Sequence, residues 1–216
     1  MKYRLAVFDM DGTILNTLGD ISASVNFALR AEHMPERTMA EIRGFVGNGV
    51  RRLIELSVPS DASQEACESV YNAFAEHYRL HCADATAPYS GIVDLLSRLR
   101  AKGMHTAVVS NKPDDAVKAL CVRYFNGLFD AAVGVRDGVR PKPCPDAVCG
   151  VLDELHIERA EAVYIGDTEV DAATAENAGL DFIAVDWGFR ERPLLEKQRA
   201  QLIASTAGEL FDALTQ

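Results

Sequence analysis

Two aspartates stand where the first apolar stretch of the chain ends. The segment FDMDGTILNT (8–17) places Asp9 and Asp11 directly after LAVF (5–8), an apolar run that predicts a buried strand. A turn requires one aspartate at most, so the pair indicates either an Asp-rich turn with a helix cap or a site that performs chemistry. Gly12 follows at once and permits a turn that brings the backbone close to a ligand.

Polar residues also follow two later apolar runs and open one expected helix. They are Ser110 and Asn111 after TAVV (106–109), Lys142 between two prolines, and Asp167 and Asp171 after AVYI (162–165). In an open parallel sheet, function gathers at the carboxyl ends of the strands. We therefore expect all of these groups to project toward one crevice.

Converging carboxylates restrict what such a crevice can bind. If Asp9, Asp11 and Asp167 meet, each pair repels by about 4 kcal/mol at 4 Å and an effective dielectric constant of 20. The carboxylates must then take up protons or bind a cation. Ligands that offer only oxygen suit a hard ion such as Mg²⁺, which accepts a substrate phosphate as a further ligand. The three aspartates therefore predict a Mg²⁺ site.

The same crevice would offer donors to the oxygens of a phosphate. Ser110, Lys142 and the backbone N–H groups next to Thr13 and Asn111 are suited to this role. A carboxylate beside a bound metal and a clamped phosphoryl group is placed to attack phosphorus and to form an aspartyl-phosphate. The sequence therefore favours phosphoryl transfer.

The elements that must position these residues read as an α/β fold. Helical patterns lie between apolar runs, for example at 90–103, and this alternation implies right-handed βαβ units in a doubly wound parallel sheet, a Rossmann-like core. Runs that are apolar on both faces suit strands covered by helices on either side. The four expected strands are LAVF (5–8), TAVV (106–109), AVYI (162–165) and FIAV (182–185).

One long segment breaks the alternation. From about Leu18 to Ala83 only helical stripes occur, one of them opened by Thr38 and Glu41 in capping-box spacing. The crossover of a βαβ unit needs only about a dozen residues, so this segment predicts an inserted helical cap domain. We expect residues 1–16 and 84–216 to form the α/β catalytic core and residues 17–83 to form the cap.

Composition excludes several classes of function. The net charge of −10 disfavours a nucleic-acid or anionic-membrane surface, and no apolar run approaches the roughly 20 residues that a membrane span needs. Five cysteines without a C-x-x-C pair indicate reduced thiols in a cytoplasmic protein. We expect a small phosphorylated metabolite as the partner, no nucleic acid and no membrane, in a monomer or homodimer.

The ordered motifs D-x-D-G-T (9–13), S-N (110–111), K-P (142–143) and G-D-x-x-x-D (166–171) resemble those of the haloacid dehalogenase-like hydrolase superfamily. Asp11 lies two residues after Asp9, so both side chains point to one side of an extended backbone. The resemblance implies that Asp9 is the nucleophile and Asp11 the general acid and base. It implies a Mg²⁺ site formed by Asp9, the Asp11 carbonyl and Asp167. It also implies that Ser110 and Lys142 bind the phosphoryl group, and that Asp171 orients Lys142 or a metal-bound water.

Further motifs indicate which group of the superfamily the chain resembles. An aspartate at position 11 favours phosphoryl chemistry over dehalogenation, and the place of the insert resembles the helical-cap phosphatases. SNKP (110–113), GDTEVD (166–171), WGF (187–189) and GNGVRRLI (47–54) are most similar to the phosphoglycolate phosphatase group. The resemblance implies contacts to the substrate from Gly47, Asn48, Gly49, Arg51 and Arg52 as well as Thr13 and Asn111, with Arg51 or Arg52 on a substrate carboxylate.

The expected activity is Mg²⁺-dependent hydrolysis of a small phosphate monoester, phosphoglycolate first among them. A sugar-phosphate mutase of the β-phosphoglucomutase type and a pyrophosphatase stay open, because these enzymes share the same motifs. A module that binds Mg²⁺ or phosphate without turnover is the remote alternative.

Overall fold

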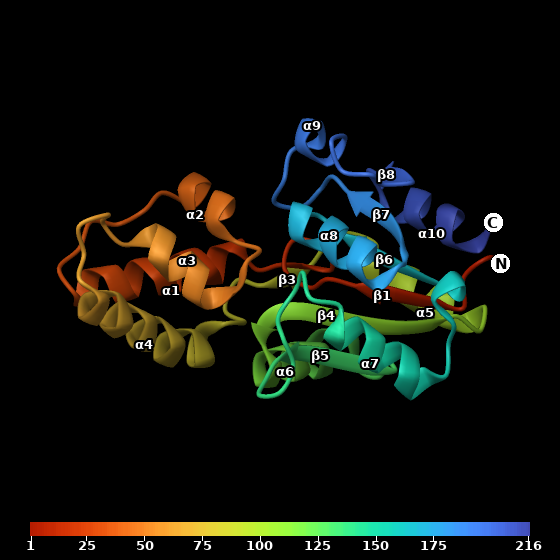
Figure 1. The fold of residues 1–216 in the computed structure, drawn as a ribbon, viewed down its shortest axis with the longest axis horizontal. Coiled ribbons are helices and arrows are strands. Elements are labelled where there is room, and N and C mark those ends of the chain that lie inside the picture. The colour runs from red at the N-terminus through yellow and green to blue at the C-terminus, as the bar shows by residue number, and fades with distance from the viewer. The chain divides into compact units, whose positions relative to one another are not determined.

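The computed structural model describes residues 1–216, which form two compact units. One unit comprises Met1–Leu15 and Pro88–Gln216, and the other comprises Asn16–Ala87. Figure 1 shows both units and labels most of their helices and strands. The first unit holds a six-stranded parallel sheet and the second is helical, so the predicted α/β fold class is confirmed.

The sheet of the first unit has the strand order β5-β4-β1-β6-β7-β8. Its central strand is fully buried and pairs in parallel on both sides, so that Leu5 lies opposite His105 and Ala162. The strands are β1 (Leu5–Phe8), β4 (His105–Pro113), β5 (Ala131–Val135), β6 (Ala162–Gly166), β7 (Asp181–Val185) and β8 (Leu202–Ala204). The four expected strands are present as β1, β4, β6 and β7. Strands β5 and β8 were not predicted, because both are edge strands that are partly exposed.

Helices cover the sheet and supply its core. Val148 and Val151 of α7 and Ala175 of α8 pack with strand residues such as Val7 and Tyr164 in one buried cluster. Thr206 caps α10 by accepting the backbone N–H of Glu209. The helices are α5 (Ile92–Ala101), α6 (Asp114–Phe125), α7 (Asp146–Leu155), α8 (Glu169–Ala178), α9 (Arg192–Leu195) and α10 (Ala207–Thr215), with a 3₁₀ turn at Arg159–Glu161.

The second unit is a helical bundle in which α1 and α4 pack against each other. Val25 and Leu29 of α1 and Phe74 of α4 are among its buried side chains. The predicted capping box of Thr38 and Glu41 opens α2. Its helices are α1 (Leu18–Ala31), α2 (Met39–Phe45), α3 (Gly49–Ser57) and α4 (Gln64–His81).

The chain passes between the units twice, through β2 (Leu15–Asn16) and β3 (Ala87–Pro88), which pair with each other. Asp20 fixes the second passage, because its carboxylate accepts the backbone N–H groups of Ala85 and Thr86 and the Thr86 hydroxyl. These bonds attach residues 85 and 86 to the helical unit. No helix is long and apolar enough to cross a membrane.

Candidate active site

Carboxylates gather at the carboxyl ends of β1 and β6. Asp9 follows β1 directly, and its backbone N–H donates to the carbonyl of Ile165 in β6. Asp167 follows β6, and Asp171 lies in the first turn of α8. Oxygen atoms of Asp9, Asp167 and Asp171 all lie within 4.8 Å of one another. The parallel sheet thus brings together carboxylates that are up to 162 residues apart in the sequence.

Asp9 lies in a buried position beside one ammonium group. Its Oδ1 atom is 2.8 Å from Nζ of Lys142, at ion-pair distance but without the alignment of a hydrogen bond. Burial raises the pKa of Asp9 to about 7; Lys142 opposes this shift, whereas the charges of Asp171 and Asp11 add to it. Further positive charge nearby would therefore favour the ionised form of this side chain at neutral pH.

Three groups hold the Lys142 ammonium: two accept hydrogen bonds from it, and the third, Asp9, is an ion-pair partner. Besides Asp9, it donates to Oδ1 of Asp171 at 2.7 Å and to the Tyr164 hydroxyl at 3.1 Å. That hydroxyl donates its own proton to the Val109 carbonyl. Burial opposes the charge, but Asp171 and Asp9 outweigh it and raise the pKa of Lys142 well above its ordinary value. Lys142 is therefore a firmly protonated, fixed cation.

Asn111 fixes the backbone that carries Lys142. The side-chain amide of Asn111 donates to the Lys142 carbonyl at 3.0 Å, and its oxygen accepts the Lys142 N–H at 2.8 Å. The amide of Asn111 thus positions the loop that carries Lys142. The motif alone does not reveal these two contacts. The predicted role of the Asn111 backbone N–H in binding phosphate stays a prediction.

Asp171 has both carboxylate oxygens engaged. One binds Lys142, and the other accepts the backbone N–H groups of Asp167 and Thr168 and the Thr168 hydroxyl, closing a capping box at the start of α8. We infer that Asp171 acts by orienting Lys142, because the cap leaves its second oxygen fully used.

Asp167 is held by groups from two distant segments. The Thr13 hydroxyl donates to its Oδ1 at 2.9 Å, and the backbone N–H of Phe189 donates to its Oδ2 at 2.7 Å. Burial raises the pKa of Asp167 well above its ordinary value, and the charges of Asp171 and Asp9 add to this shift.

Glycines allow this close packing around Asp167. A Cβ atom on Gly12, whose φ is +89°, would overlap the Asp167 carboxylate, and one on Gly188 would overlap Asp167 as well. The turn after β1 and the loop after β7 can therefore meet Asp167 only if both positions lack a side chain.

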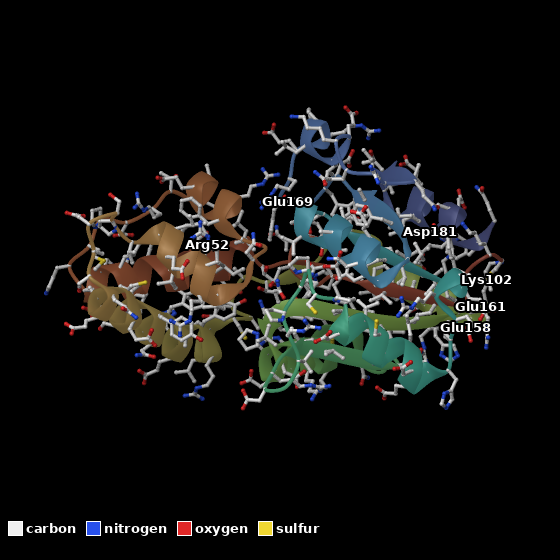
Figure 2. The ribbon with its side chains drawn as sticks, in the orientation of Figure 1. Arg52, Lys102, Glu158, Glu161, Glu169 and Asp181 are labelled. Carbon is white, nitrogen blue, oxygen red and sulfur yellow. The ribbon has the colours of Figure 1, made fainter.

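The loop after β7 supports the site in a way that its sequence did not reveal. The indole of Trp187 donates to the Thr13 carbonyl at 3.0 Å. Arg190 makes a two-point ion pair with Glu169 at the start of α8, where Figure 2 labels the acidic residue. These bonds fix the loop whose backbone holds Asp167. The WGF segment suggested a family likeness, but backbone donors such as Phe189 N–H leave no trace in side-chain type.

Lys112 is a site residue that sequence reasoning missed. Its Nζ atom lies 2.8 Å and 3.1 Å from the two carboxylate oxygens of Asp11, and only 2% of its side chain is exposed. The backbone N–H of Lys112 makes a long bond, 3.4 Å, to the hydroxyl of buried Ser110. A signal was available, because a lysine at the end of a buried strand requires an anion beside it.

The predicted core residues thus form linked groups within the first unit. Contacts join Asp9, Lys142, Asp171 and Asn111, they join Thr13 with Asp167, and they join Asp11 with Lys112 and Ser110.

The glycine-bounded segment at 47–49 lies in the second unit, at the start of α3. Gly47 and Gly49 have φ angles of +132° and +83°, which side chains rarely adopt, and Asn48 stands at the N-cap without a side-chain capping bond. Their expected contacts with the substrate stay predictions.

Both cap arginines have acidic partners within the second unit. Arg51 pairs with Glu68 at 2.8 Å and lies 4.6 Å over the ring of Tyr71. Arg52, labelled in Figure 2, pairs with Glu55 at 2.9 Å in its own helix. More than half of each arginine side chain is exposed, so these pairs contribute little and can exchange partners at low cost.

The charges of the first unit's site suit a divalent cation. Four carboxylates, those of Asp9, Asp11, Asp167 and Asp171, face two ammonium groups, those of Lys112 and Lys142. If all four are ionised, two negative charges stay unbalanced. Burial raises the pKa of Asp9 and of Asp167, and the charges of neighbouring carboxylates add to both shifts. Oxygen donors with a net charge of minus two fit Mg²⁺.

The sequence and the fold of this chain are similar to those of known proteins. Residues 6–185 match the family described as haloacid dehalogenase-like hydrolase. A phosphoglycolate phosphatase of Cereibacter sphaeroides is 37% identical over 196 residues, which cover 88% of each chain. One from Aquifex aeolicus is 31% identical over 187 residues and 86% of each chain.

Among solved structures, a protein of Lactobacillus delbrueckii subsp. bulgaricus, described as a candidate phosphoglycolate phosphatase, superposes with a TM-score of 0.94. It is 38% identical to this chain, and the match covers 99% of both chains.

Proposed function

Because the chain belongs to the haloacid dehalogenase-like hydrolase family, we propose that it hydrolyses phosphoglycolate or a similar small phosphate monoester with Mg²⁺ and through an aspartyl-phosphate on Asp9. The observation that carries this proposal is the position of Asp9, a buried carboxylate 2.8 Å from the fixed Lys142 ammonium and beside the carboxylates of Asp167 and Asp171. The helical unit would act as the cap and the α/β unit as the catalytic core.

In the first step a carboxylate oxygen of Asp9 attacks phosphorus. A bond forms between that oxygen and phosphorus, while the bond between phosphorus and the ester oxygen breaks. Asp11 donates a proton to the departing oxygen, which leaves as an alcohol. Lys142 supports the step, because its N–H that faces Asp9 can turn to an oxygen of the transferred phosphoryl group.

In the second step water attacks the phosphorus of the aspartyl-phosphate. Asp11, now a carboxylate, accepts a proton from that water, and the bond from phosphorus to Asp9 breaks to release inorganic phosphate. Ser110, which lies within β4, would supply a hydroxyl for a phosphoryl oxygen during both steps. The two steps return Asp9 and Asp11 to their starting states.

Asp9, Asp167 and the backbone carbonyl of Asp11 would hold Mg²⁺. When bound, the ion supplies positive charge that keeps the side chains of Asp9 and Asp167 ionised and stabilises the negative charge of the phosphoryl group. Thr13 and the N–H of Phe189 orient Asp167 for this role through the bonds described above.

A panel of metabolite phosphates tests the proposal, assayed with and without Mg²⁺. Phosphate release that depends on Mg²⁺ and is fastest with phosphoglycolate would support it. Conversion of a sugar phosphate into its isomer, dependent on a bisphosphate activator, would instead indicate a mutase, and preferred hydrolysis of pyrophosphate a pyrophosphatase. Phosphate or Mg²⁺ binding without turnover of any substrate would contradict the proposal.

We expect Arg51→Ala or Arg52→Ala to lower kcat/KM for phosphoglycolate by about ten- to a hundredfold. The reason is a charge-assisted contact with the substrate carboxylate, for which an exposed arginine can leave its glutamate partner. Hydrolysis of p-nitrophenyl phosphate should change much less, because this ester has no carboxylate. Steady-state kinetics on both substrates checks the expectation. Equal losses on the two substrates for each variant would show that these arginines support the fold or the general site.

A further inference from the structure

We propose that Lys112 determines specificity by binding a carboxylate on the leaving group, so that the site prefers phosphate esters of small α-hydroxy acids. This inference rests on the proposed phosphatase function, and it adds the chemical group in the core that would recognise the acid. The reasons lie in the burial of Lys112, in the identity of its partner and in the occupation of the other buried cations.

Lys112 is buried and faces the residue that must act on the leaving group. Its side chain is 2% exposed, and its ammonium bridges both carboxylate oxygens of Asp11, at 2.8 Å and 3.1 Å. Asp11 is the proposed donor of a proton to the ester oxygen. The ammonium therefore lies one carboxyl group away from the position that the leaving oxygen must occupy.

Asp11 is neutral while it carries the proton that it donates, so its ion pair with Lys112 would then weaken. A buried ammonium that loses its anionic partner is destabilised, so Lys112 then favours a substrate that brings an anion of its own. In phosphoglycolate only one methylene group separates the ester oxygen from the carboxyl group. A group that contacts Asp11 can therefore also contact this carboxylate, whereas a neutral leaving group offers no replacement.

The other buried cations of the α/β unit are held by residues with fixed tasks. Lys142 donates hydrogen bonds to Asp171 and Tyr164 and forms an ion pair with Asp9. Arg190 holds Glu169 through two parallel bonds. Lys112 differs from both, because it contacts Asp11, the proposed acid and base of the reaction.

A matched pair of substrates tests the inference with the full-length protein and Mg²⁺. The pair is 2-phosphoglycolate and the phosphate ester of glycolamide, which replaces the carboxylate by a neutral amide of nearly the same size. In Lys112→Met we expect the ratio of kcat/KM for phosphoglycolate to kcat/KM for the amide to fall at least about tenfold, beyond any loss that both esters share through the contact of Lys112 with Asp11. Lys112→Arg, which keeps the positive charge, should retain most of the preference for the acid.

Lys118→Met is the matched control, because Lys118 pairs with Asp114 on an exposed helix face and should leave both rates unchanged. Circular dichroism checks the fold of each variant, and Lys112→Gln replaces Lys112→Met if the latter is unfolded. Equal losses on both substrates would overturn the inference and leave Lys112 with a role toward Asp11 alone. A wild-type protein that hydrolyses neither ester would overturn the proposed function and this inference together.

Discussion

Asp9→Asn should reduce the hydrolysis of every phosphate ester to the uncatalysed background, a loss of at least about a thousandfold in kcat. The amide of asparagine cannot attack phosphorus, so the first bond of the reaction does not form. The substitution preserves the shape of the side chain, and Lys142 keeps its bonds to Asp171 and Tyr164. We therefore expect a folded, inactive protein, which steady-state kinetics together with circular dichroism will check.

Asp181→Asn offers a matched control for this variant. Asp181 begins β7 at the end of the strand opposite to the site, where it binds Lys2 and Tyr3, and Figure 2 labels it. This variant should keep its activity even if its stability falls. Appreciable turnover by Asp9→Asn, in protein shown by mass spectrometry to carry no deamidated residue 9, would contradict the role of Asp9 as nucleophile.

Removal of divalent metal should have an effect of similar size. We expect EDTA to abolish turnover and added Mg²⁺ to restore it, because four carboxylates face only two ammonium groups in the site. Without a bound metal ion, burial holds the pKa of Asp9 at about 7, so a large part of this side chain is protonated and unreactive at neutral pH.

The control for metal removal is EDTA that has been saturated with Mg²⁺ beforehand, which should leave the rate unchanged. Full activity in metal-free buffer would contradict the proposed Mg²⁺ site. Loss of activity that excess Mg²⁺ does not restore would contradict it as well.

The parts of the fold that were predictable have a local physical cause. A central parallel strand is buried on both faces and must be apolar throughout, so LAVF (5–8) revealed β1. Edge strands lack this constraint, and β5, with its alternation of buried and exposed residues, left no comparable run. The helix caps at Thr38 and Thr206 were also predictable, because a capping bond joins residues only three positions apart.

The candidate site was likewise predictable only in part. Its acidic and basic side chains stand in short motifs at strand ends, where the topology of a parallel sheet indicates that they converge. The partners of those side chains were not predictable, because they depend on which distant segments meet. Two such pairings are Lys112 with Asp11 and the Phe189 N–H with Asp167. The paired residues lie 101 and 22 positions apart in the sequence.

The most direct test of the account is to trap the covalent intermediate on Asp9. Enzyme mixed with ³²P-labelled phosphoglycolate and Mg²⁺ would be quenched in acid within the first turnover, reduced with borohydride and digested. Borohydride converts an aspartyl-phosphate into homoserine, so we predict acid-stable ³²P on the protein before reduction and homoserine at position 9 in the peptide mass spectrum after it. Rapid phosphate release with no homoserine at position 9, or with the label on another residue, would contradict the central claim.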